Sequence, residues 1–222
     1  MRRMMEKMRG EMTGKERLSG HNPLLNPEFW RTAGAAQVDA ALKAGADIGA
    51  RDQQCGLTPL HWAAVYSNTP TAVELLLNKA ELEAHAEEGG TPLHYAAAFS
   101  TTPEVVERLL DHGAELPACD KYGFMPLHVA ARFSAAPEVV ELLLARGAEI
   151  NARAGKEKWT PLHEAARHSA APAVIALLLA RGADGKAKDY RGRTPFDRVN
   201  DRTKGKGLDG TKVYRQLDKA RY

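Results

Sequence analysis

Four histidines are the residues of this chain whose type and spacing most suggest chemistry. His61, His94, His128 and His163 follow one another at intervals of 33, 34 and 35 residues. Imidazole can bind zinc or transfer protons near neutral pH. The even spacing places each histidine in a separate segment, so their chemistry depends on the elements that hold them.

Each histidine closes a four-residue motif that recurs along the chain. The motif is Thr-Pro-Leu-His at 58–61, 91–94 and 160–163, Met-Pro-Leu-His at 125–128 and Thr-Pro-Phe-Asp at 194–197. In the first four copies an alanine pair follows, then a proline and an apolar stretch such as 139–144. Proline suits the first turn of a helix, and the preceding threonine suits its N-cap. Each unit is therefore predicted to be two helices joined by a loop.

A short extended segment with a turn is predicted to link each unit to the next. Gly45, Gly113, Gly147 and Gly182 follow the second helix, where a left-handed residue commonly ends a helix. The segment that follows, 148–159 for example, is predicted to form a hairpin-like finger. Residues 78–81 lack the glycine and are one residue short. We expect a left-handed non-glycine residue or a different helix end there.

These repeats strongly resemble the ankyrin-repeat family, whose unit carries a Thr-Pro-Leu-His-x-Ala-Ala helix start and Gly-Ala-Asp before the finger. The resemblance covers residues 29–199. It implies an all-α ankyrin-repeat solenoid, in which helix-loop-helix units with β-hairpin-like fingers stack in one dimension. The inter-helix loop, 133–137 for example, has one extra residue and a proline in place of the common leucine. This variant is similar to repeats of bacterial ankyrin proteins.

Three parts are expected along the chain. Residues 1–28 form a basic N-terminal tail or lead-in helix, and residues 200–222 form a basic linker and a capping helix. The repeat domain comprises an N-cap at 29–57, full repeats at 58–90, 91–124, 125–159 and 160–193, and a C-cap from 194. Basic residues exceed acidic ones by three in residues 1–20 and by seven in residues 185–222, although the net charge of the chain is only +3. The middle of the chain is therefore acidic.

No catalytic centre, metal site or cofactor is predicted. Neighbouring helices pack about 8–10 Å apart, whereas zinc holds nitrogen at about 2.0–2.1 Å, so two motif histidines cannot share an ion. The resemblance implies that these histidines are structural and bridge backbone groups between a finger and the next repeat. Cys55 and Cys119 lie two units apart, which is too far for a disulfide. The sequence also lacks GxSxG, HExxH, GxGxxG and EF-hand patterns, and residues 205–212 match a phosphate loop only in part.

By the same resemblance, a partner protein is expected on the concave face, which finger tips and first helices form. The candidate binding residues are Lys121, Tyr122, Phe124, Arg132, Lys156, Trp159, Arg167, His168, Tyr190 and Arg191. Tyr122, Phe124 and Trp159 are the expected anchors, because exposed aromatic and arginine side chains often dominate interface energies. A repeated column of Tyr66, Phe99, Phe133 and His168 can serve either the stack or the partner surface.

The expected function is a non-catalytic, monomeric protein-protein interaction module in the cytoplasm, with an unidentified protein partner and no small-molecule substrate. One alternative is an inhibitor or immunity protein for a bacterial enzyme or toxin. A second is a basic-ended adaptor, because residues 1–20 set methionines beside basic residues at helical spacing. Membrane and nucleic-acid partners are disfavoured, since few aromatic residues accompany the basic ends. A third is an enzyme or receptor, for which the groove offers only Glu164 and His168. No membrane-length apolar run or secretory signal is apparent.

Overall fold

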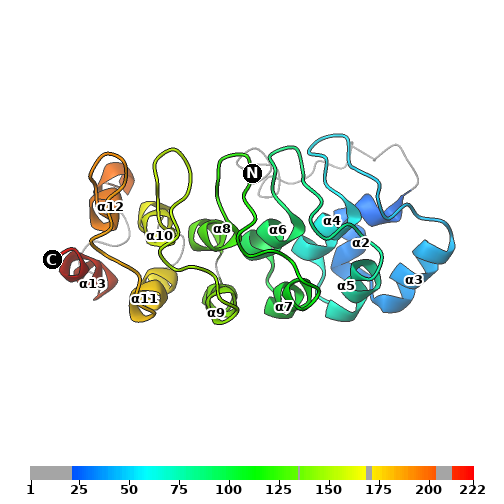
Figure 1. Cartoon of the computed structure of the whole chain (residues 1–222). Coiled ribbons are helices and arrows are strands. Elements are labelled where there is room, and N and C mark those ends of the chain that lie inside the picture. Colours follow the sequence, from blue (N-terminus) through cyan, green and yellow to red (C-terminus); the bar gives the residue numbers. More distant parts are fainter. Residues whose placement is uncertain (1–21, 135, 169–171, 204–211) are drawn as a thin grey trace.

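The computed structural model describes residues 22–134, 136–168, 172–203 and 212–222, and these residues form a stack of helix pairs. The elements are η1 (Pro23–Leu25), α2 (Pro27–Thr32), α3 (Ala35–Lys43), α4 (Pro59–Tyr66), α5 (Pro70–Leu77), α6 (Pro92–Phe99), α7 (Pro103–Asp111), α8 (Pro126–Phe133), α9 (Pro137–Ala145), α10 (Pro161–His168), α11 (Pro172–Ala180), α12 (Pro195–Thr203) and α13 (Lys212–Ala220). Figure 1 shows two rows of helices, with α2 and the even-numbered helices to α12 above and their partners below. Long loops rise above the upper row.

Proline begins every helix from α4 to α12, as the repeated motif predicts. At the N-caps of α4 and α6, Thr58 and Thr91 have extended backbones, with φ near −86°. The four glycines that follow second helices all have φ between 88° and 97°. The sequence signals for the beginning and end of each helix are therefore confirmed where both are present.

The unit that lacks the terminal glycine ends its second helix in another way. Asn78 keeps a right-handed conformation, with φ −71° and ψ −11°. The amides of Lys79 and Ala80 both donate to the carbonyl of Leu76, and the Asn78 side chain donates to the carbonyl of Glu74. Of the two alternatives, the different helix end is correct, because these bonds satisfy the last carbonyls without a left-handed residue.

The core runs continuously between the two rows of helices. Each motif leucine of the first four units is at most 3% exposed, and so is each alanine of the pair that follows it. Branched side chains of the second helices, such as Val140 and Leu143, meet them and are fully buried. Alanine lets adjacent helices approach closely, so no unit buries its apolar face without its neighbours.

Both ends of the stack are closed by caps. At the N-terminal end, Leu24 is buried and its carbonyl accepts the indole N–H of Trp30 at 2.8 Å. Among the described residues, η1 and α2 therefore precede the first full repeat and cover its apolar face. At the other end, α13 packs on α11 and α12 and buries Leu217. Gly185 abuts Ala220 so closely that a Cβ there would lie 2.5 Å from the alanine methyl group.

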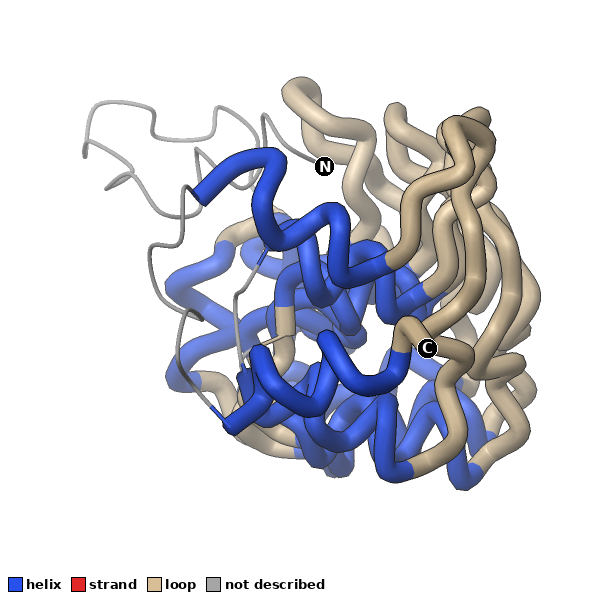
Figure 2. Tube along the Cα trace, turned by 90° about the vertical axis from the view of Figure 1, so that its left-hand side faces the viewer, coloured by secondary structure: helices blue, strands red, loops and turns tan. Residues whose placement is uncertain are grey.

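The loops form a wall of fingers beside the helices. Figure 2 looks along the stack and shows the tan loops gathered on one side of the blue helices. Backbone hydrogen bonds join neighbouring finger tips. The amides of Glu87, Lys121 and Tyr190 donate to the carbonyls of Cys55, Glu88 and Glu157, respectively, at 2.9–3.0 Å. Within the described residues the only β-bridge pairs Ala154 with Trp159, so the fingers are hairpin-like without extended strands. No helix in the described part is long and apolar enough to cross a membrane.

Candidate functional site

The motif histidines join each first helix to the next finger. The Nδ1 atom of His61 accepts the Thr58 amide at 3.2 Å and lies 2.8 Å from the threonine hydroxyl. Its Nε2 atom lies 3.1 Å from the carbonyl of Gly90, which fixes Nε2 as the donor. His94 and His163 repeat this arrangement with the carbonyls of Phe124 and Arg193. The inter-repeat bridge that the resemblance implies is therefore present.

The third unit departs from this pattern because Met125 replaces the threonine. His128 still reaches the neighbouring finger, where Nε2 lies 3.0 Å from the carbonyl of Ala152 and 3.1 Å from that of Trp159. Its Nδ1 atom is buried and has no hydrogen-bond partner among the described residues. One capping interaction is therefore missing from α8.

The histidines are held in the neutral form. Burial lowers the pKa of His61 and of His128 to about 4, and it also lowers the pKa of His94 and of His163. In three of the four rings both nitrogens are already engaged with the backbone or a threonine, which leaves none to bind a metal. Within the described residues no group of three or more His, Cys, Asp or Glu side chains could hold a metal ion.

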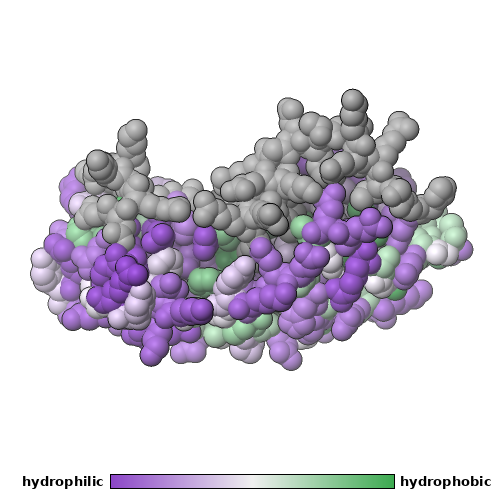
Figure 3. Space-filling view, turned by 90° about the horizontal axis from the view of Figure 1, so that it is seen from above, coloured by the Kyte–Doolittle hydropathy of each residue, from purple (hydrophilic) through white to green (hydrophobic). Residues whose placement is uncertain are grey.

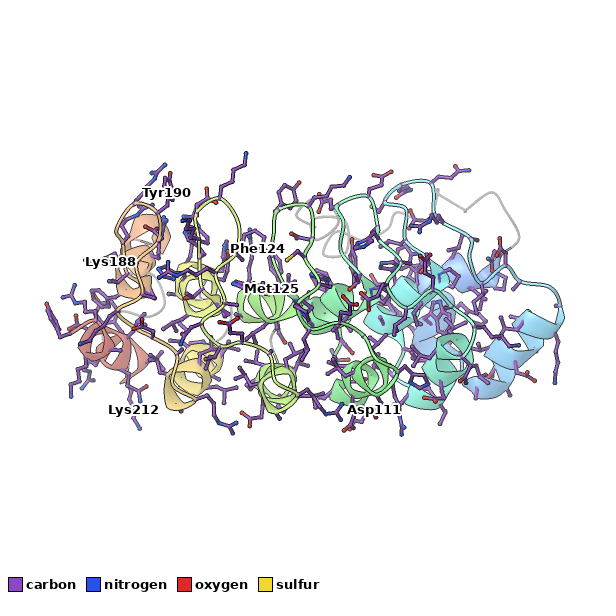
Figure 4. The ribbon with its side chains drawn as sticks, in the orientation of Figure 1. Asp111, Phe124, Met125, Lys188, Tyr190 and Lys212 are labelled. Carbon is purple, nitrogen blue, oxygen red and sulfur yellow. The ribbon has the colours of Figure 1, made fainter. Side chains whose placement is uncertain are left out.

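An aspartate shapes three of the five fingers. Asp120 Oδ1 accepts the amides of Tyr122 and Phe124 at 2.9 Å, and Asp52 and Asp189 make equivalent bonds. A side chain that accepts hydrogen bonds from its own backbone two residues ahead, and again four residues ahead or, for Asp52, five, fixes the turn. These turns present Tyr122 and Tyr190 outward, and the two rings are 58% and 52% exposed. Figure 4 places Tyr190 at the tip of the last finger and Phe124 near the start of α8.

The fourth finger is built differently. It has Ala154 in place of the aspartate, and it is closed by the bridge between Ala154 and Trp159. Lys158 occupies the position that Gly56, Gly89, Gly123 and Gly192 hold in the other fingers. Its φ is 54°, a left-handed conformation that costs a lysine about 1 kcal/mol.

An apolar cavity opens between the third finger and the first helices. Its volume is about 280 Å³, and it is lined by Glu88, Asp120, Tyr122, Phe124, His128, Val129, Arg132 and Phe133. Phe133 is also part of the repeated aromatic column. Its ring lies 6.1 Å from Phe99 and 6.4 Å from His168, centroid to centroid, while Tyr66 stacks on Trp62. The column therefore packs the stack and, at Phe133, also borders the cavity.

A second cavity lies between the fourth and fifth fingers and is strongly basic. Its volume is about 440 Å³, and it is lined by Glu157, Trp159, Arg167, Tyr190, Arg191, Arg193 and Arg198. We call it the arginine pocket. Asp189 lies behind it, paired with Arg198, and 3.6 Å from Nε of Arg193. Burial acts to raise the pKa of Asp189. The hydrogen bonds from the backbone amides of Arg193 and Arg191 and the positive charge of Arg198 have a larger, opposite effect, so the pKa of Asp189 is lowered.

Trp159 does not lie open on the surface, so the expectation of an exposed anchor there is wrong. The residue is only 7% exposed. The guanidinium carbons of Arg167 and Arg198 lie 4.9 and 4.5 Å from the ring centroid, and such cation-π contacts stabilise the covered ring. Its indole nitrogen has no hydrogen-bond partner among the described residues.

Glu164 and His168, the two residues that could suggest an enzyme, form a buried contact. Oε2 of Glu164 lies 3.5 Å from Nε2 of His168 and 3.7 Å from a guanidinium nitrogen of Arg132. Burial raises the pKa of Glu164 to about 7, although Arg132 and Arg167 act in the opposite direction. The Glu164 side chain is 0% exposed. Glu164 is not among the residues that line either cavity.

The structure groups the other predicted binding residues along the third to fifth fingers and first helices. Lys121, Tyr122, Lys156, Tyr190 and Arg191 are exposed, and Phe124, Arg132, Arg167 and His168 are half-buried. Viewed from above the fingers, the described surface is mostly hydrophilic, with small separate hydrophobic patches (Figure 3).

Sequence reasoning missed Arg198 as a site residue. Arg198 follows Asp197 at the motif position that is Trp62 in the first unit and Tyr95 in the second. The available signal was the change of this column from Trp62, Tyr95 and Val129 in the first three units to the charged residues Glu164 and Arg198 in the last two. Cys55 is half-buried and Cys119 exposed, and both are free thiols. The basic segment 1–20 and the linker segment 204–211 lie outside the described residues.

The sequence also matches a known protein family. A family model described as ankyrin repeats, in three copies, matches residues 33–118, 70–154 and 98–189. Together the matches span most of the described helix pairs. A comparison with curated proteins finds no match.

Proposed function

Because the chain belongs to the ankyrin-repeat family, whose members are generally protein-protein interaction modules, we propose that it is a non-catalytic module that binds a partner protein on its concave face. We define this face as the third to fifth fingers together with α8, α10 and α12. The partner would lie against the finger tips and the first helices rather than the second helices.

The observation that carries this proposal is the position of the exposed aromatic rings. The large hydrophobic side chains that the described residues expose are Tyr122, Tyr190 and Tyr222, and two of these stand at finger tips. Tyr122 borders the apolar cavity beside Phe124 and Phe133. An exposed tyrosine next to an apolar cavity is typical of an interface anchor, since it buries area and keeps a hydroxyl for bonding.

The rigidity of the fingers supports the same proposal. Hydrogen bonds from finger amides to Asp120 and Asp189, and backbone hydrogen bonds between neighbouring finger tips, hold Tyr122 and Tyr190 in place before a partner binds. A preorganised surface loses little conformational entropy on binding, so a few anchors can give useful affinity.

Affinity capture from a lysate of the source organism tests the proposal. The bait proteins are the wild type, the double variant Tyr122→Ala/Tyr190→Ala, and Tyr222→Ala as a control that removes an exposed tyrosine elsewhere. We expect a protein that the wild type and the control retain and the folded double variant loses. Identical capture by all three baits, or no captured protein, would contradict binding on this face.

A further inference from the structure

We propose that the row of fingers is an interface between two copies of this chain, which face each other in antiparallel order across a two-fold axis at the third finger. The partner of the proposed function, on which this inference rests, is then a second copy, and a dimer replaces the monomer expected from the sequence. The fingers comprise residues 44–57, 78–90, 112–124, 146–159 and 181–193. Figure 1 shows them side by side in a single row.

The charge of this row changes sign along its length. The first three fingers contain eight acidic and three basic side chains, a net charge of −5 with histidine counted as neutral. The last two contain nine basic and four acidic side chains, a net charge of +5. Paired groups are included in both sums, because the field at a distance depends on the net charge. One part of the row is therefore acidic and the other is equally basic.

A two-fold axis at the third finger sets opposite charges against each other. The first finger of one copy, with a net charge of −1, faces the fifth finger of the other, with +3. The second finger, with −3, faces the fourth, with +2. Both contacts occur twice, because an isologous interface repeats every contact. Parallel alignment of the same two rows would instead set like charges together, so the charge pattern favours the antiparallel order.

Charged side chains at the fingers that face each other are exposed. They are Glu81 and Glu87 on the second finger and Lys156 and Lys158 on the fourth. Glu81 is loosely paired within the chain, since Arg51 lies 3.9 Å away. Exposed charges of this kind steer two surfaces together and fix their register, but they add little affinity. A further contact must therefore supply most of the affinity.

The third finger, which lies at the axis, supplies an apolar contact. Its tip carries Tyr122, which is 58% exposed, and the apolar cavity of about 280 Å³ opens beside this ring. Phe124, Val129 and Phe133 also line the cavity. Because the axis brings two third fingers together, Tyr122 of each copy meets the other copy next to its cavity. An exposed ring beside an apolar cavity suits a surface that faces itself, since each copy offers both an anchor and a place to bury it.

Charge reversal in the whole chain tests this arrangement. The acidic-finger variant is Glu81→Lys/Glu87→Lys, and the basic-finger variant is Lys156→Glu/Lys158→Glu. All four side chains are exposed, so each variant should fold, and unchanged thermal unfolding confirms it. Light scattering after gel filtration, over a series of protein concentrations at low salt, measures the mass in solution.

The matched control is Glu104→Lys/Glu138→Lys. It reverses two exposed glutamates in the first turns of α7 and α9, which belong to the second helices and not to the fingers. It therefore changes the net charge of the chain as much as the acidic-finger variant does.

We expect the wild type and the control to form dimers as the protein concentration rises. Each finger variant should associate at least about tenfold more weakly, because like charges then face each other. An equimolar mixture of the two finger variants should recover dimers, since the reversed charges of one copy face opposite charges of the other. Tyr122→Ala should weaken the dimer about tenfold, Tyr222→Ala less than about twofold, and high salt should weaken the wild-type dimer.

Three outcomes would overturn the inference. A wild type that stays monomeric at every concentration would reject the second copy. The proposed function would still stand if lysate capture returned a different protein that Tyr122→Ala/Tyr190→Ala loses, and it would fail too if capture returned nothing. Finger variants that dimerise like the wild type, or a mixture that recovers no dimers, would reject the antiparallel charge pairing. Masses that keep growing beyond two chains would replace the two-fold axis with head-to-tail assembly.

Discussion

At the scale of the residue, a histidine occupies the position that glutamate or glutamine holds in an ordinary capping box. His61 accepts the amide of its own N-cap threonine and also reaches the carbonyl of Gly90 in the next finger. One side chain therefore caps a helix and joins two repeats. In the fifth unit Asp197 accepts the Thr194 amide at 2.8 Å, and its short side chain caps only its own helix.

The missing cap in the third unit leads to a prediction about stability. Met125→Thr would give His128 Nδ1 the hydroxyl and amide geometry that His61 has in the first unit. We expect the free energy of unfolding to rise by about 1 kcal/mol, the usual contribution of an N-cap side chain. Denaturation in urea measures this change. Met125→Val is the matched control, because it copies the shape of threonine without the hydroxyl, and equal stability of the two variants would reject the explanation.

The buried histidines also predict a pH dependence. The pKa values of His61 and His128, both about 4, lie below the ordinary value near 6.5. Between these two pH values the unfolded chain therefore binds more protons at these histidines than the folded chain does. Stability is therefore full above about pH 6.5 and falls as the pH drops towards 4, by roughly 3 kcal/mol per histidine at most. The raised pKa of Glu164 acts in the opposite sense, because its burial costs less once the carboxyl is protonated below about pH 7.

Urea denaturation at pH 7, 6, 5 and 4 measures this dependence. His61→Gln should lower stability at pH 7, because a buried bridge is lost or weakened, and should also flatten the decline between pH 6.5 and 4. A decline as steep as that of the wild type would show that His61 does not carry the dependence.

Single residues also mark where sequence reasoning ends. The motif predicts the start of each repeat helix, because threonine and proline act locally. The burial of Trp159 is not predictable in this way. It depends on guanidinium groups that arrive from α10 and α12, one of them from a residue 39 positions along the chain.

At the scale of the element, ion pairs tie the second helices to one another. Arg146, after α9, bonds Glu107 at 2.7 Å and Asp111 at 2.8 Å, both on α7. Arg181, directly after α11, pairs with Glu141 on α9, and Nε2 of His112, directly after α7, lies 3.2 Å from Glu74 on α5. The sequence spacing places these residues in the same register, but the pairing itself depends on how the units stack. The changed end of α5 is a similar case, since the missing glycine predicted an irregularity and not its form.

The double pairing of Arg146 predicts a small, salt-dependent effect. Arg146→Gln should lower the free energy of unfolding by about 0.5–1 kcal/mol at low salt and by less in 1 M NaCl, because the three side chains are partly exposed and screened. Arg108→Gln on α7, which makes no ion pair within the described residues, is the control and should change stability little. Equal losses in both variants, or a loss that salt does not reduce, would contradict the role of the pairs.

At the scale of the whole molecule, residues that recur in every repeat determine the fold, and residues that differ between repeats form the candidate site. The repeated residues build the stack, so the fold could be predicted from five motif copies. The candidate site lies where repeats differ, for example at Tyr122, Trp159, Tyr190 and Arg198, and of these four only Arg198 was not predicted as a binding residue. The cavities escape sequence analysis because each is lined by residues from two or more units, whose separation depends on the stacking.

Hydrogen-deuterium exchange of the protein with and without its captured partner tests the central claim most directly. The account predicts slower exchange in the complex at the amides of residues 119–125, 154–159 and 188–193, with α7, α9 and α11 unchanged. The finger amides report contact, and the second helices serve as an internal control. Slower exchange confined to the second helices, with the fingers unaffected, would contradict binding on the concave face.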